Sequence, residues 1–227
     1  MRRFFRAELP CAAEPLCSLS SDESHHIFRV NKIAQQEEFI LFNGRGESCV
    51  VILEQTIQQH VIARWQRELP KVEQEKQLWL CLSLLKQQAW STALRMATEL
   101  GVTHIVPIRA QRSIQRQAKK ERWHKIILSA VKQSGRTLLP QLHDVHSIEE
   151  LSFLPTRIPS TVLCPHTPVR LQTCDRENAL LIGPEGGLTE GEYALLEAQG
   201  WTRSTLSSPI LRADTAVAAA LAVRILS

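Results

Sequence analysis

Leu180-Leu-Ile-Gly-Pro-Glu-Gly-Gly187 carries the plainest signal of fold in this chain. A short apolar run ends in a glycine-rich turn, and Thr189-x-x-Glu192 follows with the spacing of a helix capping box. We therefore expect a buried strand, a tight turn and a helix that runs to Gly200. Ligands of parallel α/β sheets bind beyond the carboxyl ends of strands, where glycine lets the backbone approach them closely. A ligand site and a plain strand–helix turn explain this pattern equally well.

The sequence around this turn alternates between short apolar runs and segments with helical periodicity. The expected strands are at 78–85, 102–108, 161–164, 179–182 and 202–206. The expected helices are at 87–100, 119–134, 148–153, 189–200 and 214–226. The helix at 148–153 begins with a second capping-box pattern, Ser147-x-x-Glu150. Such alternation predicts an α/β fold with a parallel sheet that helices cover on both faces.

The first 70 residues have a different texture. Two β-rich runs flank Asn43-Gly44, which is the strongest short hairpin signal in a sequence. A further strand is expected at 61–65, so residues 1–70 are predicted to form a small, mostly antiparallel domain, a partly closed barrel. The polar segment 71–76 follows Pro70 and is interpreted as a linker, which makes 71–227 the second domain.

The composition excludes several classes of protein. The chain has 227 residues, 44% of them hydrophobic and 22% charged, which fits one large globular domain or two unequal ones. No apolar run reaches the roughly 20 residues of a membrane span, and the basic start lacks the apolar core of a signal peptide. The six cysteines include no C-x-x-C pair, and no Cys/His set has the spacing of a metal site. We expect a cytosolic protein with reduced thiols and no metal.

The net charge of +4 hides an uneven distribution. Seven basic residues lie within 17 positions, with one acid among them: Arg109, Arg112, Arg116, Lys119, Lys120, Arg122 and Lys125. Arg2, Arg3 and Arg6 add a basic N-terminus, whereas 175–197 is acidic. A charge run is usually only a solvated face, but this flank also suits phosphate contacts.

A second strand-to-helix turn spans 206–216. Asp214 or Thr215 is expected to cap the last helix, which leaves Arg212 at the mouth of the loop. A capped helix with an exposed arginine would explain the same residues without any ligand. The helix is rich in alanine, which fits close packing at a subunit interface and ordinary core packing equally well. Neither turn is a G-x-G-x-x-G fingerprint or a P-loop, so nucleotide-phosphate and dinucleotide binding are disfavoured.

These motifs together resemble the SPOUT class of RNA methyltransferases. The glycine-rich turn and Ile210-Leu-Arg-x-Asp-Thr-Ala216 carry the resemblance. Four further segments agree in order and spacing: His25-His26-Ile-Phe-Arg-Val30, Ala97-Thr-Glu-Leu-Gly-Val102, Gln111-Arg-Ser113 and Gln133-Ser-Gly-Arg136. Within the class, the chain resembles the branch that methylates N3 of a uridine in 16S ribosomal RNA.

The resemblance implies a PUA-like N-terminal barrel, a C-terminal domain with a deep trefoil knot, S-adenosylmethionine as cofactor, and a homodimer. The cofactor-binding residues it implies are Leu163, Gly183, Pro184, Glu185, Gly186, Gly187, Leu206, Ser207, Ile210, Leu211, Arg212 and Thr215. The implied RNA-binding residues are Arg2, Arg3, Arg29, Arg109, Arg112, Gln133 and Arg136. Arg212 and Asp214 are the expected catalytic residues: a cation beside the uracil oxygens would stabilise the charge that develops there.

The chain departs from the family pattern at four positions. Ser207, Pro209 and Asp214 replace a glycine, an arginine and a glutamate, and Lys132 stands where an acid is common. The fold and the cofactor should survive these changes, because contacts in such loops are largely made by backbone. They leave two alternatives open: a SPOUT enzyme that acts on another RNA, and a catalytically weak ribosome-assembly factor.

Overall fold

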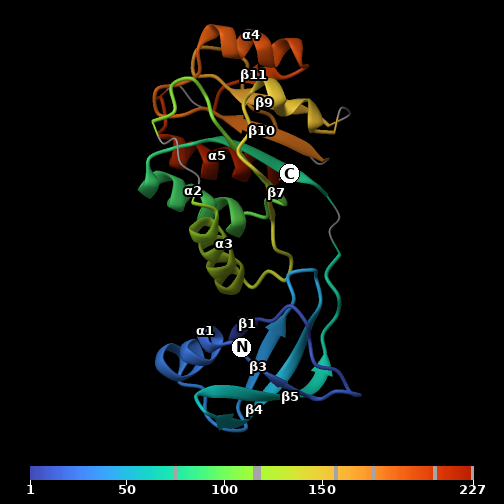
Figure 1. The fold of residues 1–227 in the computed structure, drawn as a ribbon. Coiled ribbons are helices and arrows are strands. Elements are labelled where there is room, and N and C mark those ends of the chain that lie inside the picture. Colours follow the sequence, from blue (N-terminus) through green and yellow to red (C-terminus); the bar gives the residue numbers. More distant parts are fainter. Residues whose placement is uncertain (74–75, 115–118, 156–157, 175–176, 207–208, 226–227) are drawn as a thin grey trace. The chain divides into compact units, whose positions relative to one another are not determined.

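The structure is a computed structural model (Figure 1) that describes residues 1–227 except 74–75, 115–118, 156–157, 175–176, 207–208 and 226–227. The side chains of residues 29–31 also lie outside the description. The chain forms two compact units. The first comprises Met1–Gln74 with Val131–Leu139, and the second comprises Glu75–Ala130 with Pro140–Ser227.

The first unit is built on a five-stranded sheet in the order β1-β3-β4-β5-β2. Its elements are β1 (Arg3–Phe5), β2 (Leu16–Ser18), α1 (Ser21–His25), the π-helix η1 (His26–Asn31), β3 (Glu38–Phe42), β4 (Ser48–Ile57) and β5 (His60–Glu68). The pair β1–β3 is parallel and the other pairs are antiparallel. The turn at Asn43-Gly44 joins β3 to β4 as predicted. The apolar core of this unit includes Phe4, Phe39, Leu41, Val51 and Val61.

The segment Val131–Leu139, which belongs to the first unit, packs against that turn. Gly44 has a positive φ of 77°, and a β-carbon there would collide with Cδ1 of Leu139. The amide of Leu139 donates to the carbonyl of Gly44 at 2.9 Å. A side chain at position 44 would therefore both strain the backbone and displace Leu139.

Lys132 has a specific partner in this unit. Its ammonium pairs with the carboxylate of Glu23, whose side chain is only 7% exposed. Glu23 lies in the first turn of α1, which Ser20 caps. A buried carboxylate needs a nearby cation, because its desolvation is otherwise uncompensated. The basic residue at position 132 is thus matched by an acid 109 residues earlier in the chain.

The second unit contains a six-stranded, fully parallel sheet in the order β11-β9-β10-β6-β7-β8. Its elements are β6 (Leu78–Ser83), α2 (Gln87–Glu99), β7 (His104–Ile108), α3 (Lys120–Ser134, whose last turn belongs to the first unit), β8 (Gln141–Leu142), the 3-10 helix η2 (Glu149–Phe153), β9 (Ser160–Leu163), β10 (Asn178–Ile182), α4 (Glu190–Ala198), β11 (Thr202–Ser204) and α5 (Ala213–Ile225). The predicted α/β class and parallel sheet are confirmed.

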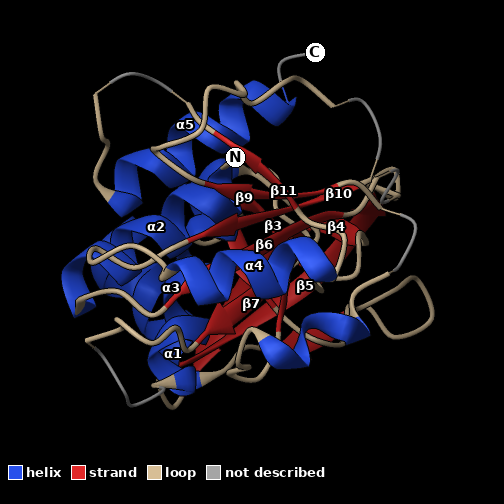
Figure 2. Ribbon diagram, turned by 90° about the horizontal axis from the view of Figure 1, so that it is seen from above, coloured by secondary structure: helices blue, strands red, loops and turns tan. Residues whose placement is uncertain are grey.

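Helices cover both faces of this sheet. In Figure 1, α4 lies on one side of β9 and β10, and α2 and α5 lie on the other. Alternate residues of a strand face opposite sides, so Cys81 and Leu181 join the core beneath α4 and η2, while Leu80 and Leu180 point the other way. Figure 2, seen from above, shows α4 in front of strands of this sheet.

Two expectations about helix ends were wrong. The last helix begins at Ala213, so Asp214 and Thr215 lie in its first turn and neither is the capping residue. The Asp214 carboxylate still accepts from the amide of Thr215 at 3.1 Å. At 149–153 the helix is 3-10, and Ser147 does not cap it with its hydroxyl; only the Glu150 half of that box forms, to the Ser147 amide at 2.7 Å. By contrast, Thr189 and Glu192 form a complete capping box.

No helix in the described part of the chain has the length and apolar character that crossing a bilayer requires.

Candidate active site

A cavity of about 360 Å³ lies in the second unit, where β9 and β10 end. We call it the larger chamber. Three segments supply most of its wall: the residues after β9, the glycine-rich turn after β10, and the loop that enters α5. Its lining comprises Ala89, Leu163, Pro165, Ile182, Gly183, Pro184, Glu185, Gly187, Tyr193, Ile210, Leu211, Arg212, Ala213, Asp214 and Ala216.

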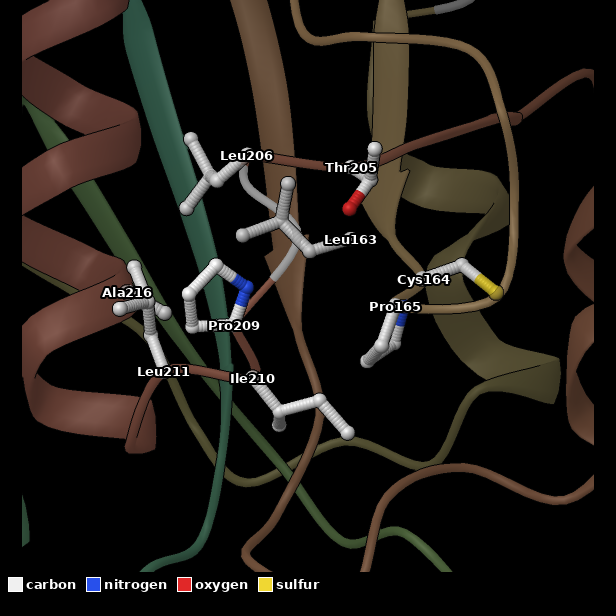
Figure 3. A pocket seen from close by; sticks show the side chains of 9 residues that line it. All are labelled: Leu163, Cys164, Pro165, Thr205, Leu206, Pro209, Ile210, Leu211 and Ala216. Carbon is white, nitrogen blue, oxygen red and sulfur yellow. The ribbon is translucent and has the colours of Figure 1, made fainter.

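A smaller chamber of about 60 Å³ shares five of these residues, among them Leu163, Ile210 and Leu211. Figure 3 shows its described lining residues, among which only Thr205 and Cys164 carry polar side-chain groups, a hydroxyl and a thiol. The remaining labelled side chains are aliphatic, and Leu206 and Pro209 contribute here but not to the larger chamber. The described lining of the smaller chamber is thus mostly apolar, whereas the larger chamber also presents the charged side chains of Glu185, Arg212 and Asp214.

The glycine-rich turn is braced by its neighbours. The Glu185 carboxylate accepts from the amide of Lys86 at 3.0 Å, at the start of α2, where a negative charge also interacts favourably with the helix dipole. Arg112 Nη1 donates to the carbonyl of Gly186 at 3.1 Å. Gly187 has a φ of +70°, which explains the need for glycine at the end of the turn.

Two carboxylates and one guanidinium border the larger chamber. Arg212 has a side chain 82% exposed, and its Nε lies 3.6 Å from Oδ1 of Asp214, whose side chain is 19% exposed. Glu185 is the second acid of the lining. This arrangement can attract a cationic ligand inward, while the arginine remains available to a group that approaches from solvent.

The predicted cofactor residues divide into three groups. Leu163, Gly183, Pro184, Glu185, Gly187, Leu206, Ile210, Leu211 and Arg212 line one chamber or both. Gly186 and Thr215 line neither, and Ser207 lies outside the described residues. Tyr193, Pro165 and Ala216 line the cavity without having been predicted. One feature of the sequence could have indicated Tyr193: it follows the capping-box residue Glu192 directly, on a helix that was expected to cover the sheet.

The predicted RNA-binding residues are spread over both units. In the first unit, Arg2 pairs with Glu37 at 3.0 Å, Gln133 is exposed, and Nη2 of Arg3 donates to the carbonyl of Arg136 at 3.3 Å. Burial lowers the pKa of Arg136. The side chain of Arg29 is not described. In the second unit, Arg109 and Arg112 are exposed.

The basic cluster of the second unit faces solvent at every described position: Arg109, Arg112, Lys119, Lys120, Arg122 and Lys125 are all exposed, while Arg116 is not described. Lys120 pairs with Asp144, and Arg112 is bonded to the glycine-rich turn. Within the ranges that the structure describes, no group of three or more His, Cys, Asp or Glu side chains could hold a metal ion.

Comparisons with known proteins identify the family of this chain. The family model for the RNA methyltransferase domain matches residues 72–225, and the chain belongs to this family. Ribosomal RNA small subunit methyltransferase E of Bacillus subtilis is 28% identical over 226 residues, an alignment that covers 89% of this chain and 86% of the relative. The protein of the same name from Synechocystis is 30% identical, with 92% and 72% covered.

A solved structure extends the similarity to three dimensions. The crystal structure of ribosomal RNA small subunit methyltransferase E from Neisseria gonorrhoeae bound to S-adenosyl methionine matches with a TM-score of 0.90 at 28% identity. The match covers 98% of this chain and 95% of that one, so it includes both units.

Proposed function

We propose that this protein transfers a methyl group from S-adenosylmethionine to N3 of a specific uridine in 16S ribosomal RNA of the small subunit. The observation that carries the proposal is the two-chambered cavity at the carboxyl ends of β9 and β10, with Arg212 at its edge, in a chain that resembles a cofactor-bound enzyme over almost its whole length.

The residues present fit the cofactor. S-adenosylmethionine joins a flat purine to a methionyl portion that carries a sulfonium, an ammonium and a carboxylate. Leu163, Leu206 and Ile210 of the smaller chamber offer apolar contact to the purine, and Glu185 and Asp214 of the larger chamber offer negative charge. When bound, the cofactor supplies an electrophilic methyl group on sulfur.

Arg212 is the residue that acts on the nucleotide. N3 of uracil must lose its proton to become a nucleophile, and negative charge then spreads onto O2 and O4. The guanidinium of Arg212 donates to these oxygens and stabilises that charge, while the carboxylate of Asp214, 3.6 Å from Arg212 Nε, orients it. The exposed position of Arg212 allows it to meet RNA that comes from solvent.

Both units contribute to RNA binding in this proposal. Arg2, Arg3, Arg29, Gln133 and Arg136 do so from the first unit, and Arg109 and Arg112 from the second. The exposed basic cluster supports phosphate contacts, which depend on charge and not on sequence. Duplex RNA offers little base-edge readout, so the substrate is an assembled ribosomal particle that presents a splayed nucleotide.

We further infer that residues 1–70 form a PUA-like RNA-binding barrel and residues 71–227 a SPOUT domain with a deep trefoil knot. Arg6 Nη1 donates to the carbonyl of Ser18 at 3.0 Å, a link between the ends of the two edge strands β1 and β2 that supports a partly closed barrel. The enzyme acts in the cytoplasm as a homodimer. The partly exposed Ala218, Ala219 and Ala222 of α5 offer a close-packing surface for the second copy.

The test uses small ribosomal subunits that lack the modification and tritiated S-adenosylmethionine. Arg212→Ala should reduce methyl transfer about 10²-fold, the usual loss for one donor to a developing oxyanion, with an unchanged melting temperature. Arg95→Ala is the matched control, because Arg95 is also an exposed arginine but lies in α2, outside the cavity lining, and this variant should retain full activity. Unchanged transfer by the Arg212 variant would overturn the assigned role.

The same assay separates the alternatives. An assembly factor would bind the cofactor in calorimetry but transfer no methyl group to the particle. An enzyme for another RNA would leave the small subunit unlabelled and label transfer RNA or the large subunit instead. Mapping the labelled nucleotide then identifies the target directly.

A further inference from the structure

The hydroxyl of Tyr193 bonds to the wall of the cavity. It donates to the carbonyl of Leu163 at 3.2 Å, and Leu163 is both the last residue of β9 and a lining residue of both chambers. Tyr193 itself comes from α4, is 5% exposed and lines the larger chamber. One hydrogen bond therefore joins the helix after the glycine-rich turn to the place where the first cofactor loop leaves the sheet.

This bond has a defined direction. Burial raises the pKa of Tyr193, so the phenol stays protonated at neutral pH and acts as a donor. The bond gives the carbonyl of Leu163 a donor at the end of its strand. The neighbouring amide of Cys164 is held separately, by the carbonyl of Ser204 at 2.8 Å.

A second contact holds the tyrosine ring in place. The guanidinium of Arg203 lies over the ring, 4.5 Å from its centroid. Arg203 in turn pairs with Glu190 at 3.0 Å and with Glu197 at 2.9 Å. Because two acids of α4 fix the arginine and the arginine covers the ring, the hydroxyl has little freedom to leave Leu163.

We propose that Tyr193 is a positioning residue whose hydroxyl sets the affinity for the cofactor by fixing the carbonyl of Leu163. The inference rests on the proposed function, because it takes S-adenosylmethionine as the occupant of the two chambers. Tyr193 lines the larger chamber and has no part in the proposed stabilisation of the uracil oxygens, so its loss should weaken cofactor binding and leave the rate at saturating cofactor unchanged.

The experiment compares Tyr193→Phe with the unaltered protein by calorimetry, using S-adenosylmethionine and S-adenosylhomocysteine. The Kd for both should rise about 3- to 10-fold, the equivalent of one net hydrogen bond. The KM for the cofactor should rise by the same factor, while kcat and the KM for ribosomal subunits should stay within 2-fold. Arg203→Met, which frees the ring but keeps the hydroxyl, should raise the Kd about 2-fold and serves if Tyr193→Phe does not fold.

The matched control is Thr98→Val, which removes another buried hydroxyl of the same unit, bonded to the carbonyl of Leu94 at 2.8 Å within α2. It should lower the melting temperature without a change in Kd. A wild-type Kd in both Tyr193→Phe and Arg203→Met, or a fall in kcat alone, would overturn the proposal while the function stands. Failure of the unaltered protein to bind either compound would instead overturn the proposed function.

Discussion

Glu192 Oε1 accepts a hydrogen bond from the amide of Gln111 at 2.7 Å. The other oxygen of the same carboxylate accepts from the amide of Thr189 at 2.7 Å, within the capping box of α4. One side chain thus joins the helix that follows the glycine-rich turn to the exposed loop after β7, which begins the basic cluster. A predicted RNA-contact loop is therefore hydrogen-bonded to the helix that follows the predicted cofactor-binding turn.

Glu192→Ala should therefore lower the free energy of unfolding by about 1–2 kcal/mol, because it removes a capping box and leaves the Gln111 amide unpaired. It should also weaken binding to ribosomal subunits, since the loop after β7 is released. Chemical denaturation and a filter-binding assay measure the two effects. Glu190→Ala, which alters an 80% exposed acid two residues earlier in α4, should change either value little, and an equal effect in both variants would contradict the linkage.

Arg112→Ala should raise the Kd for S-adenosylmethionine about 3- to 10-fold, because the guanidinium holds the carbonyl of Gly186. Arg109→Ala is the control in the same loop. Arg109 is exposed, and its removal is expected to affect RNA binding alone, through the loss of a phosphate contact. It should leave the cofactor Kd unchanged and reduce the salt dependence of RNA binding by about one charge. Equal cofactor Kd values for the two variants would show that the contact with Gly186 does not support the turn.

The hairpin of β4 and β5 is expected to be a site of easy stabilisation. Gln58 and Gln59 have φ values of 47° and 68°, in the left-handed region that asparagine and glycine adopt most readily. The double change Gln58→Asn with Gln59→Gly should raise the free energy of unfolding by about 1 kcal/mol, measured by denaturation. Gln58→Val should have the opposite sign, because a β-branched residue tolerates positive φ poorly.

The surroundings of His104 lead us to expect that the folding stability of the second unit decreases in acid. Its ring stacks on Trp79 at 3.7 Å, and its Nδ1 lies 3.2 Å from Nε2 of His143. Burial, with His143 beside it, lowers the pKa of His104 to about 4. Between pH 6.5 and 4 the unfolded chain binds a proton that the folded chain does not, so stability falls as the pH falls through this range.

The free energy of unfolding is expected to fall by about 1–2 kcal/mol between pH 6.5 and 4. This is less than the whole shift in the pKa of His104 would give, because the ring is partly exposed to solvent. Urea denaturation at a series of pH values measures it. His104→Phe keeps an aromatic ring on Trp79 and should flatten the profile between pH 6.5 and 4. His124→Asn, at an exposed histidine of α3, should leave the profile unchanged.

Local patterns in the sequence predicted most of the second unit. The apolar run before Gly183, the capping box at Thr189 and the periodicity of 87–100 are short-range signals, and each element formed close to its predicted bounds. The predicted capping residue of α5 was wrong. The helix begins at Ala213, directly after Arg212, because the path of the preceding loop determines where its first turn starts. A capping residue cannot be identified from residue type alone when several suitable residues are adjacent.

The contacts that shape the cavity and brace each unit join residues far apart in the chain. Glu23 and Lys132 are separated by 109 residues, Arg112 and Gly186 by 74, and Leu163 and Tyr193 by 30. By itself, the sequence determined the elements, their alternation and the residues at the strand ends, because hydrophobic period and turn chemistry act over a few positions. Only the tertiary structure decided which of these residues meet, because strand order and packing bring distant segments together, and neither is encoded in local spacing.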